Sequence, residues 1–222
     1  MVKQFKDKRA ALQWYTSIAL PIVLVGGWIF PLLGFFLLLC MFGAVGIAFY
    51  RGRAWCDWMC PRGSFYDLAV HRLSRNAVIP AVFKTSRVRG LILGLLVIVL
   101  GVQIYYAWGD SYAVGRAFVR VLTVTTMAGI VLGAVYKPRA WCQICPMGTL
   151  ANWISGGKKQ PLHVTEHCRD CKLCERVCPM QLKPYESKSG YMTEGDCIKC
   201  SSCVAVCPAK ALSFPHELKD AA

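Results

Sequence analysis

Three long stretches of the chain contain no charged side chain, and this feature limits the fold more than any other. They cover residues 14–50, 90–109 and 121–136, which are 37, 20 and 16 residues long. About 20 apolar residues are needed for one helix to cross the roughly 30 Å of hydrocarbon in a bilayer. The sequence therefore predicts a protein that is permanently embedded in a membrane. A helical bundle with a large buried core is the less favoured alternative.

The first uncharged run is long enough for two membrane helices rather than one. As a single unbroken helix it would extend about 54 Å, which exceeds the thickness of the bilayer. Gly26, Gly27 and Pro31 lie near its middle and favour a break there. We therefore predict four membrane helices, near residues 13–30, 32–50, 89–108 and 118–136. The last of these includes Arg120, whose side chain must extend towards the membrane interface.

Basic residues are distributed unevenly between the two predicted sides of the membrane. Sixteen Lys and Arg residues lie in the N-terminal tail, the middle loop and the segment just after the fourth helix, whereas the opposite side has only Arg116 and Arg120. The tail contributes Lys3, Lys6, Lys8 and Arg9. Loops rich in Lys and Arg stay on the cytoplasmic side of a membrane. We therefore expect a bacterial inner-membrane protein whose two termini and C-terminal region are cytoplasmic.

The chain has 13 cysteines and a formal charge of +14. A nucleic-acid-binding protein can be as basic, but it would not contain such long apolar runs, so we expect no nucleic-acid partner. All cysteines except Cys40 occur in tight groups that end in Cys-Pro. Disulfide scaffolds are typical of small secreted domains, and nothing in this sequence indicates secretion. Grouped thiols on a cytosolic face instead indicate metal or iron–sulfur binding.

Two motifs near the C-terminus have the pattern C-x2-C-x2-C-x3-C-P, beginning at Cys168 and at Cys197. In two-cluster ferredoxins the first three cysteines of such a motif bind one [4Fe–4S] cluster, and the fourth binds the other cluster. The pattern predicts one cluster on Cys168, Cys171, Cys174 and Cys207. It predicts a second cluster on Cys178, Cys197, Cys200 and Cys203. Zinc is the weaker alternative, because zinc sites favour two separated pairs of ligands.

These features divide the chain into two predicted domains. Residues 1–157 form a membrane domain with four helices, and residues 158–222 form an α+β module like a bacterial ferredoxin with two clusters. The Gly- and Lys-rich segment at residues 156–161 joins them. Two clusters replace much of a hydrophobic core in so small a module. The predicted fold is therefore mainly α-helical, and the predicted task of the module is one-electron transfer.

A second cysteine pattern occurs twice, each time after a predicted helical hairpin. The sequence YRGRAWC at residues 50–56 resembles YKPRAWC at residues 136–142, and each is followed by Cys-Pro-x-Gly and then Ser or Thr. Three residues separate the two cysteines of the first copy, and two residues separate those of the second. The pattern predicts a membrane domain built as two hairpin repeats.

The cysteines of the two copies, Cys56, Cys60, Cys142 and Cys145, are predicted to lie at the same face of the membrane. Four thiols complete one [4Fe–4S] cluster or one zinc site. The Cys-Pro ending that they share with the C-terminal motifs favours a third [4Fe–4S] cluster between the two halves. A pair of redox dithiols, or structural thiols without a metal, is the alternative. Cys40, within the second helix, is expected to be a small buried hydrophobic residue.

The apolar helices, the repeated Cys-Pro motif and the two C-terminal motifs together resemble the membrane-bound ferredoxin subunits of the NapH type. The resemblance extends over essentially the whole chain. Relatives in that family accompany periplasmic nitrate reductase, nitrous-oxide reductase and methylamine dehydrogenase. The resemblance implies electron exchange with the quinone pool or with a partner respiratory complex that includes a cytochrome or a periplasmic reductase or dehydrogenase. Cys56 and Cys60 match the Cys-x3-Cys-Pro motif of the family, while Cys142 and Cys145 depart from it by one residue.

None of the four histidines falls inside a predicted membrane helix, so we expect no haem. Without a metal centre of its own across the bilayer, the chain would pass electrons to a quinone or to another subunit. Residues near the third predicted cluster are candidates for contacting a quinone: Tyr50, Trp55, Asp57, Trp58, Arg62 and His71. Trp and Tyr also collect at membrane interfaces, and Arg on the cytoplasmic side, which is the simpler interpretation of these residues.

Two classes of function remain open at this point. The first is an electron-transfer subunit of a respiratory oxidoreductase complex, such as a quinol dehydrogenase. The second is an assembly factor that uses its clusters to reduce a metal centre or a disulfide in another protein. A redox sensor is a weaker third class, because no output domain is recognisable. Stable copurification with a respiratory enzyme would favour the first class.

Overall fold

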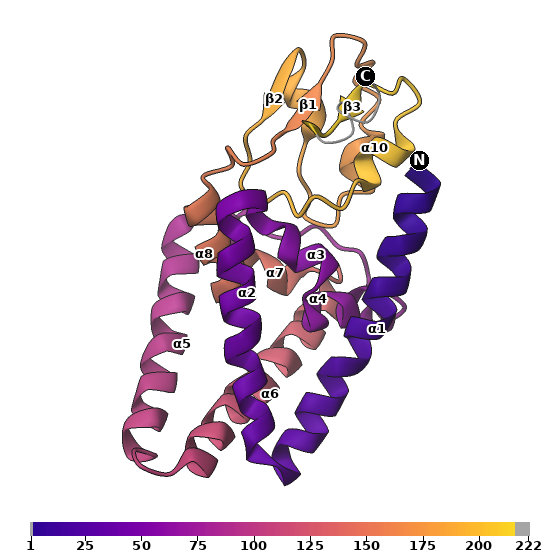
Figure 1. Ribbon diagram of the computed structural model, residues 1–222. Helices are drawn as coiled ribbons and strands as arrows, with labels where there is room; N and C mark the ends of the chain where they lie inside the picture. The colour runs from indigo at the N-terminus through magenta and orange to yellow at the C-terminus, as the bar shows by residue number, and fades with distance from the viewer. Residues whose placement is uncertain (1, 216–222) are drawn as a thin grey trace.

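The computed structural model describes residues 2–215, with side chains described from Arg9 onward. Lys3, Lys6 and Lys8 of the predicted cytoplasmic tail lie outside the described side chains, and residues 216–222 lie outside the described part of the chain. Within residues 2–215 the fold is mainly helical, with one small sheet. Figure 1 shows four long helices and a C-terminal segment that covers one end of them.

Four helices are long and apolar enough to cross a membrane, in agreement with the four predicted from the sequence. They are α1 (Val2–Ile29), α2 (Phe36–Arg51) within the longer helical stretch Pro31–Val70, α5 (Ser86–Tyr106) and α6 (Ser111–Val135). Large apolar side chains remain exposed on them, among them Val25, Leu39, Leu91 and Val131. Exposed apolar side chains suit a lipid environment, in which the hydrogen-bonding groups of the backbone must find partners within the protein. The four apolar helices therefore identify a membrane protein.

The break in the first apolar run occurs at Pro31. Helix α1 ends at Ile29, and the short 3-10 helix η1 (Pro31–Phe35) leads into α2. Proline suits the first position of a helix, because its missing N–H has no partner there. Gly26 and Gly27, by contrast, lie inside α1 and do not end it. Helix α1 extends past the N-terminal boundary predicted for the first membrane span: it begins at Val2 rather than near residue 13, because Lys, Gln and Ala in the tail favour a helix.

The fourth membrane helix also begins earlier than predicted. Helix α6 starts at Ser111 rather than near residue 118, because Asp110 caps it: its carboxylate accepts a hydrogen bond from the backbone N–H of Tyr112 at 2.9 Å. Only residues 107–110 therefore connect α5 to α6. Arg116 and Arg120 consequently lie within the helix, on its exposed side.

Two glycines allow the η1 turn to pack directly against α6. A Cβ at Gly34 would collide with the carbonyl oxygen of Gly115, and a Cβ at Gly115 would collide with that of Pro31. A larger residue at either position would push the two elements apart. This contact fixes the hairpin of α1 and α2 against α6.

Several short helices lie where the long helices meet the C-terminal segment (Figure 1). After α2 come η2 (Gly52–Ala54), α3 (Trp55–Trp58), α4 (Pro61–Phe65), the π-helical turn η3 (Tyr66–Val70) and η4 (Ala81–Lys84). After α6 come α7 (Ala140–Ile144) and α8 (Pro146–Ser155). The first copy of the RAWC sequence lies in η2 and α3, and the second begins at Arg139, the N-cap of α7.

The C-terminal segment, residues 156–215, contains a three-stranded antiparallel sheet and short helices. The strands β1 (Leu162–Val164), β2 (Gly190–Met192) and β3 (Leu212–Ser213) lie in the order β2-β1-β3. The helices are α9 (Leu173–Arg176), η5 (Pro184–Ser187) and α10 (Ser202–Val206). Its core includes Val164, Phe214 and most of its cysteines, and it is continuous with Cys56 and Cys142. The C-terminal segment is therefore packed on the membrane region rather than tethered beside it.

Candidate functional site

The four cysteines of the repeated membrane-region motif line a single cavity of about 110 Å³. Cys56 and Cys142 are buried, and Cys60 and Cys145 are half-buried. Apolar side chains of α1, α2 and α6 form much of the remaining wall. The structure thus brings together two cysteine pairs that are far apart in the sequence.

Each Cys-Pro pair of this motif begins a short helix. Pro61 is the first residue of α4 and Pro146 is the first residue of α8, positions where proline loses no hydrogen bond. A residue before proline is driven out of the helical conformation, and Cys60 and Cys145 accordingly have ψ angles of 112° and 130°. The Cys-Pro sequence therefore separates each cysteine from the helix that follows it.

The arginine of each RAWC sequence contacts a cysteine of the other copy. Arg53 donates from Nη2 to the carbonyl oxygen of Cys142. Arg139 donates from Nη1 to the carbonyl oxygen of Cys56 at 2.7 Å. Both arginines are buried, with 1% and 0% of their surface exposed. The two arginines therefore join the two copies of the motif around the cavity.

The repeated glycine of the Cys-Pro-x-Gly sequence makes room for these arginines. A Cβ at Gly63 would lie 2.7 Å from the carbonyl oxygen of Cys56 and 3.4 Å from Nη1 of Arg139. A Cβ at Gly148 would overlap the guanidinium group of Arg53. Each glycine therefore has a steric role in the contact between the two copies.

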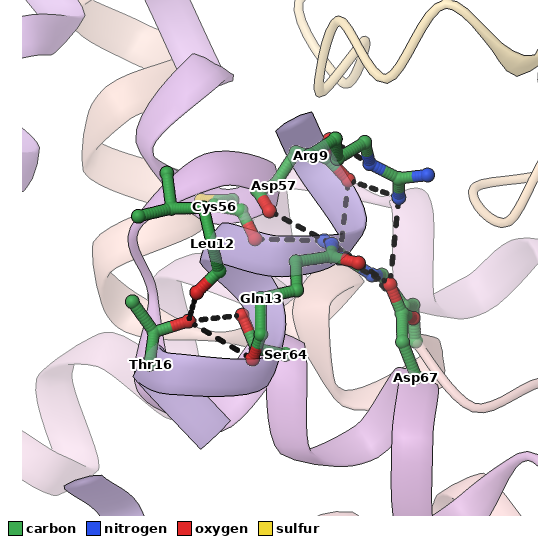
Figure 2. Close-up of polar contacts among 9 residues, drawn as sticks. Arg9, Leu12, Gln13, Thr16, Cys56, Asp57, Ser64 and Asp67 are labelled. Atoms are coloured by element: carbon green, nitrogen blue, oxygen red, sulfur yellow. Dashed lines mark hydrogen bonds and ion pairs between the residues drawn. The ribbon is translucent and has the colours of Figure 1, made fainter. Parts of the chain in front are cut away.

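Two carboxylates neutralise Arg139: Asp57, within the first copy of the motif, and Asp67, in η3 just after it. Its Nη2 lies 2.6 Å from Oδ2 of Asp67 and 3.1 Å from Oδ1 of Asp57. Arg9 of α1 also donates to both oxygens of Asp57, at 2.6 and 2.7 Å. Figure 2 shows Arg9 and Gln13 of α1 reaching Asp57 and Asp67. The completely buried carboxylate of Asp57 thus has two arginine partners, as a buried charge requires.

Arg53, in contrast, is neutralised by the C-terminal segment. Its Nη1 lies 2.6 Å from Oδ1 of Asp196, the residue directly before Cys197. Arg89 binds both oxygens of the same carboxylate, at 2.9 and 2.6 Å, and Asn152 donates to it at 2.8 Å. Burial alone would raise the pKa of Asp196, but hydrogen bonds from Arg89 and the charge of Arg53 hold that pKa below its ordinary value. The ionised carboxylate therefore ties the C-terminal segment to the membrane region.

Two further cavities, both in the C-terminal segment, are each lined by four cysteines. One of about 50 Å³ is lined by Cys168, Cys171, Cys174 and Cys207. The other, of about 20 Å³, is lined by Cys178, Cys197, Cys200 and Cys203. Each set is the one that the sequence pattern assigns to a single cluster.

The two cysteine loops of the C-terminal segment share an unusual backbone. A non-glycine residue with positive φ stands on each side of the second cysteine, namely Asp170 and Lys172 in one loop and Lys199 and Ser201 in the other. The backbone N–H groups of Leu182 and Ala211 donate to Sγ of Cys178 and Cys207, each at 3.4 Å. Left-handed backbone at non-glycine residues is uncommon and collects at functional sites. Because both loops have the same backbone geometry, they form two equivalent binding loops.

The second of these cysteine sets lies next to the membrane region. Lys137, just after α6, donates to the carbonyl oxygen of Cys178 at 3.1 Å, and burial lowers the pKa of this lysine. Gln143 of α7 donates to the carbonyl oxygen of Met180, also at 3.1 Å. Cys171 of the first set is exposed instead. One set therefore faces the membrane region, and the other faces the outside of the molecule.

The structure separates the residues predicted to contact a quinone. Trp55 and Arg62 line the 110 Å³ cavity beside the cysteines. Asp57 is not part of the cavity wall, and its carboxylate forms ion pairs with two arginines. His71 follows η3, is exposed, and is also absent from the wall. Cys40 does line the cavity and is half-buried, whereas the sequence predicted a buried residue with no such role.

The chemistry of the 110 Å³ cavity fits a cluster of iron and sulfide. Arg53 and Arg139 place two positive charges beside the thiols, which would offset the negative charge of thiolates bound to a cluster. The indole Nε1 of Trp141, a wall residue, is buried without an acceptor among the described residues, and cluster sulfur accepts such hydrogen bonds. Among the side chains of residues 9–215, no three of His, Cys, Asp or Glu gather closely enough for one metal ion. Four cysteine thiols around one cavity can together hold a [4Fe–4S] cluster.

Sequence reasoning missed the residues that hold these thiols in place. Arg53 and Arg139 stand at the same position of the repeated RAWC sequence, and Gly63 and Gly148 at the same position of Cys-Pro-x-Gly. The occurrence of these arginines and glycines in both copies of the motif is the signal that could have identified them. Asp196 had a weaker signal, its position directly before a predicted cluster ligand.

Comparison with protein families gives two matches. A family described as a 4Fe-4S binding domain matches residues 33–80 and 119–163, which include both copies of the membrane-region motif. A family described as a 4Fe-4S dicluster domain matches residues 167–212. Both cysteine-rich parts of the chain therefore match families that bind iron–sulfur clusters.

Curated proteins from several organisms are similar to this chain. An uncharacterized protein of Methanocaldococcus jannaschii is 31% identical over 182 residues, which cover 80% of this chain and 70% of that protein. The methylamine utilization ferredoxin-type protein MauN of Methylobacillus flagellatus is 30% identical over 142 residues, 59% of this chain and 49% of MauN. The ferredoxin-type protein NapH of Escherichia coli is 26% identical over 179 residues, 70% of this chain and 59% of NapH. No solved structure matches the chain.

Proposed function

Because this chain belongs to the NapH-type ferredoxin family, we propose that it is a membrane-bound electron-transfer subunit with three [4Fe–4S] clusters. Family membership itself establishes an iron–sulfur electron-transfer protein of the ferredoxin type. The number of clusters, the orientation in the membrane and the redox partner are the parts that we propose. Such clusters supply one-electron transfer when they are bound.

The observation that carries the proposal is the convergence of two distant cysteine pairs on one cavity. We assign one cluster to Cys56, Cys60, Cys142 and Cys145, which share that cavity. The other two clusters are assigned to the two sets of four cysteines in the C-terminal segment. The crossed contacts of Arg53 and Arg139 support the first assignment, because they hold the two pairs together.

Contacts around the three cysteine sets support an order in which the C-terminal set with Cys178 lies between the set with Cys171 and the membrane-region set. Cys171 of the first set is exposed, and the set that includes Cys178 is hydrogen-bonded to the membrane region through Lys137. Asp196 then connects the second set to Arg53, and Arg53 contacts Cys142 of the membrane-region set. This arrangement suits a subunit that exchanges electrons between an exposed cytoplasmic surface and the membrane.

We further propose two domains, residues 1–157 and 158–222, with both termini on the cytoplasmic side of the inner membrane. The uneven distribution of basic residues supports this orientation. The two segments matched by one family model, residues 33–80 and 119–163, support a membrane domain of two hairpin repeats.

The redox partner in the membrane is proposed to be a quinone or a respiratory complex that uses one. Leu20, Val23 and Leu122 line the cysteine cavity from two membrane helices, so this part of its wall is apolar. Trp55 and Arg62 lie on the same wall and supply groups that hold a quinone ring. Arg62 donates to Oγ1 of Thr125 at 3.0 Å, which fixes its guanidinium group at the cavity.

Reduction by a soluble quinol tests this proposal. Purified protein is mixed anaerobically with a short-chain menaquinol or ubiquinol, and bleaching of the cluster absorbance is followed. We expect reduction of the wild type, slower reduction of Arg62→Gln, and a wild-type rate for Arg87→Gln, an exposed arginine at the start of α5. Clusters that react with dithionite but with neither quinol would contradict the quinone role and favour the assembly factor.

A further inference from the structure

We propose that a groove between α5 and α6 binds the headgroup of a phospholipid, at the end of the molecule opposite the cysteines. Figure 1 shows α5 and α6 meeting at that end, away from the C-terminal segment. The groove has a volume of about 420 Å³ and is lined by the last turns of α5 and the first turns of α6. It shares no residue with the cysteine cavities, so this site is independent of the proposed electron transfer.

Two cations without a partner share this groove. Arg116 and Arg120 both line it, and their spacing of four residues places them on one face of α6. Among residues 9–215, whose side chains are described, no carboxylate forms an ion pair with either. Asp110, the acidic residue at this end of α6, accepts the N-terminal hydrogen bond of the helix instead. An anion that binds these two arginines would therefore come from outside the chain.

The position of the two arginines along α6 suits a lipid phosphate. At about 1.5 Å per residue, Arg116 and Arg120 lie roughly 8 and 14 Å from the start of the helix. Side chains on a helix tilt towards its N-terminus, and long cationic side chains near a helix end extend to the membrane interface. Both guanidinium groups can therefore reach the level of the phosphates.

Gln103 of α5 narrows the choice of headgroup. Its Nε2 donates to the carbonyl oxygen of Val99 at 3.4 Å, while its Oε1 is buried without a donor among the described residues. A buried oxygen without a hydrogen bond costs free energy, and this cost is removed only when a hydrogen-bond donor binds to it. A phosphate has none to offer, but an ethanolamine ammonium or a glycerol hydroxyl does. The site therefore fits phosphatidylethanolamine or phosphatidylglycerol better than phosphatidylcholine.

Short side chains leave the space that a headgroup needs. Ala113 and Ala117 line the groove on α6, and Ala107 lines it where α5 ends. Tyr106, on the same wall, brings a hydroxyl group that can donate to a phosphate oxygen. Positive charge, a free acceptor and open space thus occur together at one membrane-facing place.

Native mass spectrometry of the full chain released from nanodiscs tests this inference. In nanodiscs of phosphatidylethanolamine and phosphatidylglycerol, the wild type should keep one lipid after partial delipidation. The double variant Arg116→Gln/Arg120→Gln should keep it with an occupancy lower by about tenfold or more. The control Arg87→Gln removes the same kind of charge at the other end of α5 and should keep the wild-type occupancy.

The headgroup is tested in the same way with a second variant. The wild type should keep less lipid in nanodiscs of phosphatidylcholine alone, and Gln103→Leu should lose the preference for phosphatidylethanolamine and phosphatidylglycerol. Equal lipid retention by the wild type and the double variant would overturn the proposal. So would an equal loss in Arg87→Gln, since it would show only a general attraction between lipid and basic residues.

Discussion

Arg139 donates a hydrogen bond to the carbonyl oxygen of Cys56 at 2.7 Å, across 83 residues of sequence. Arg53 stands in the same relation to Cys142. The two contacts differ in the source of the neutralising carboxylate. Arg139 pairs with Asp57 and Asp67 of the membrane region, whereas Arg53 pairs with Asp196 of the C-terminal segment. One arginine therefore joins the two halves of the membrane region, and the other also joins them to the C-terminal segment.

Replacing Arg139 with leucine should destabilise the protein strongly. The carboxylates of Asp57 and Asp67 would lose a partner within the membrane region, and breaking one side of a buried ion pair costs about 3–5 kcal/mol. Denaturant or thermal unfolding in detergent measures this loss. Arg72→Leu, at an exposed position, is the control and should change the free energy of unfolding by no more than about 0.5 kcal/mol. Similar stability of the two variants would show that the buried network has no such role.

A methyl group at Gly148 should disturb the membrane-region cluster. The new Cβ would overlap the guanidinium group of Arg53 and displace it from Cys142. We expect Gly148→Ala to lose up to about four iron atoms per chain, the content of one [4Fe–4S] cluster. Gly46→Ala is the matched control, because a Cβ there meets nothing within 4 Å. Iron content that is unchanged in Gly148→Ala would argue against this steric role.

The sequence was most informative where a local pattern carries the structure. The four membrane helices follow from runs of apolar residues, and the grouping of the C-terminal cysteines follows from their spacing. The start of α6 was predicted too late. The helix begins at Ser111 because Asp110 caps it, although Arg116 and Arg120 then lie within the helix. The ion pairs of Asp57 and Asp196 could not be predicted, since their partners lie 48 and 143 residues away in the sequence. Such pairs depend on how the elements pack, and no local pattern encodes them.

Removing the charge of Asp196 should loosen the C-terminal segment from the membrane region. Asp196→Asn leaves the buried guanidinium groups of Arg53 and Arg89 without their carboxylate. Limited proteolysis at residues 156–161 should then become faster by about tenfold or more, because loss of a buried charge partner costs several kcal/mol. Glu186→Gln breaks only an exposed pair with Lys183 and should leave the rate unchanged. Equal cleavage rates in Asp196→Asn and the wild type would contradict this account of the interface.

The most direct measurement is the content of iron and acid-labile sulfide in anaerobically purified protein. Three [4Fe–4S] clusters require about twelve iron atoms and twelve sulfides per chain. The variant Cys142→Ser should fall to about eight of each, while Cys40→Ser, which changes a thiol on the same cavity wall, should keep about twelve. About eight in the wild type, with no change in Cys142→Ser, would contradict the proposed membrane-region cluster.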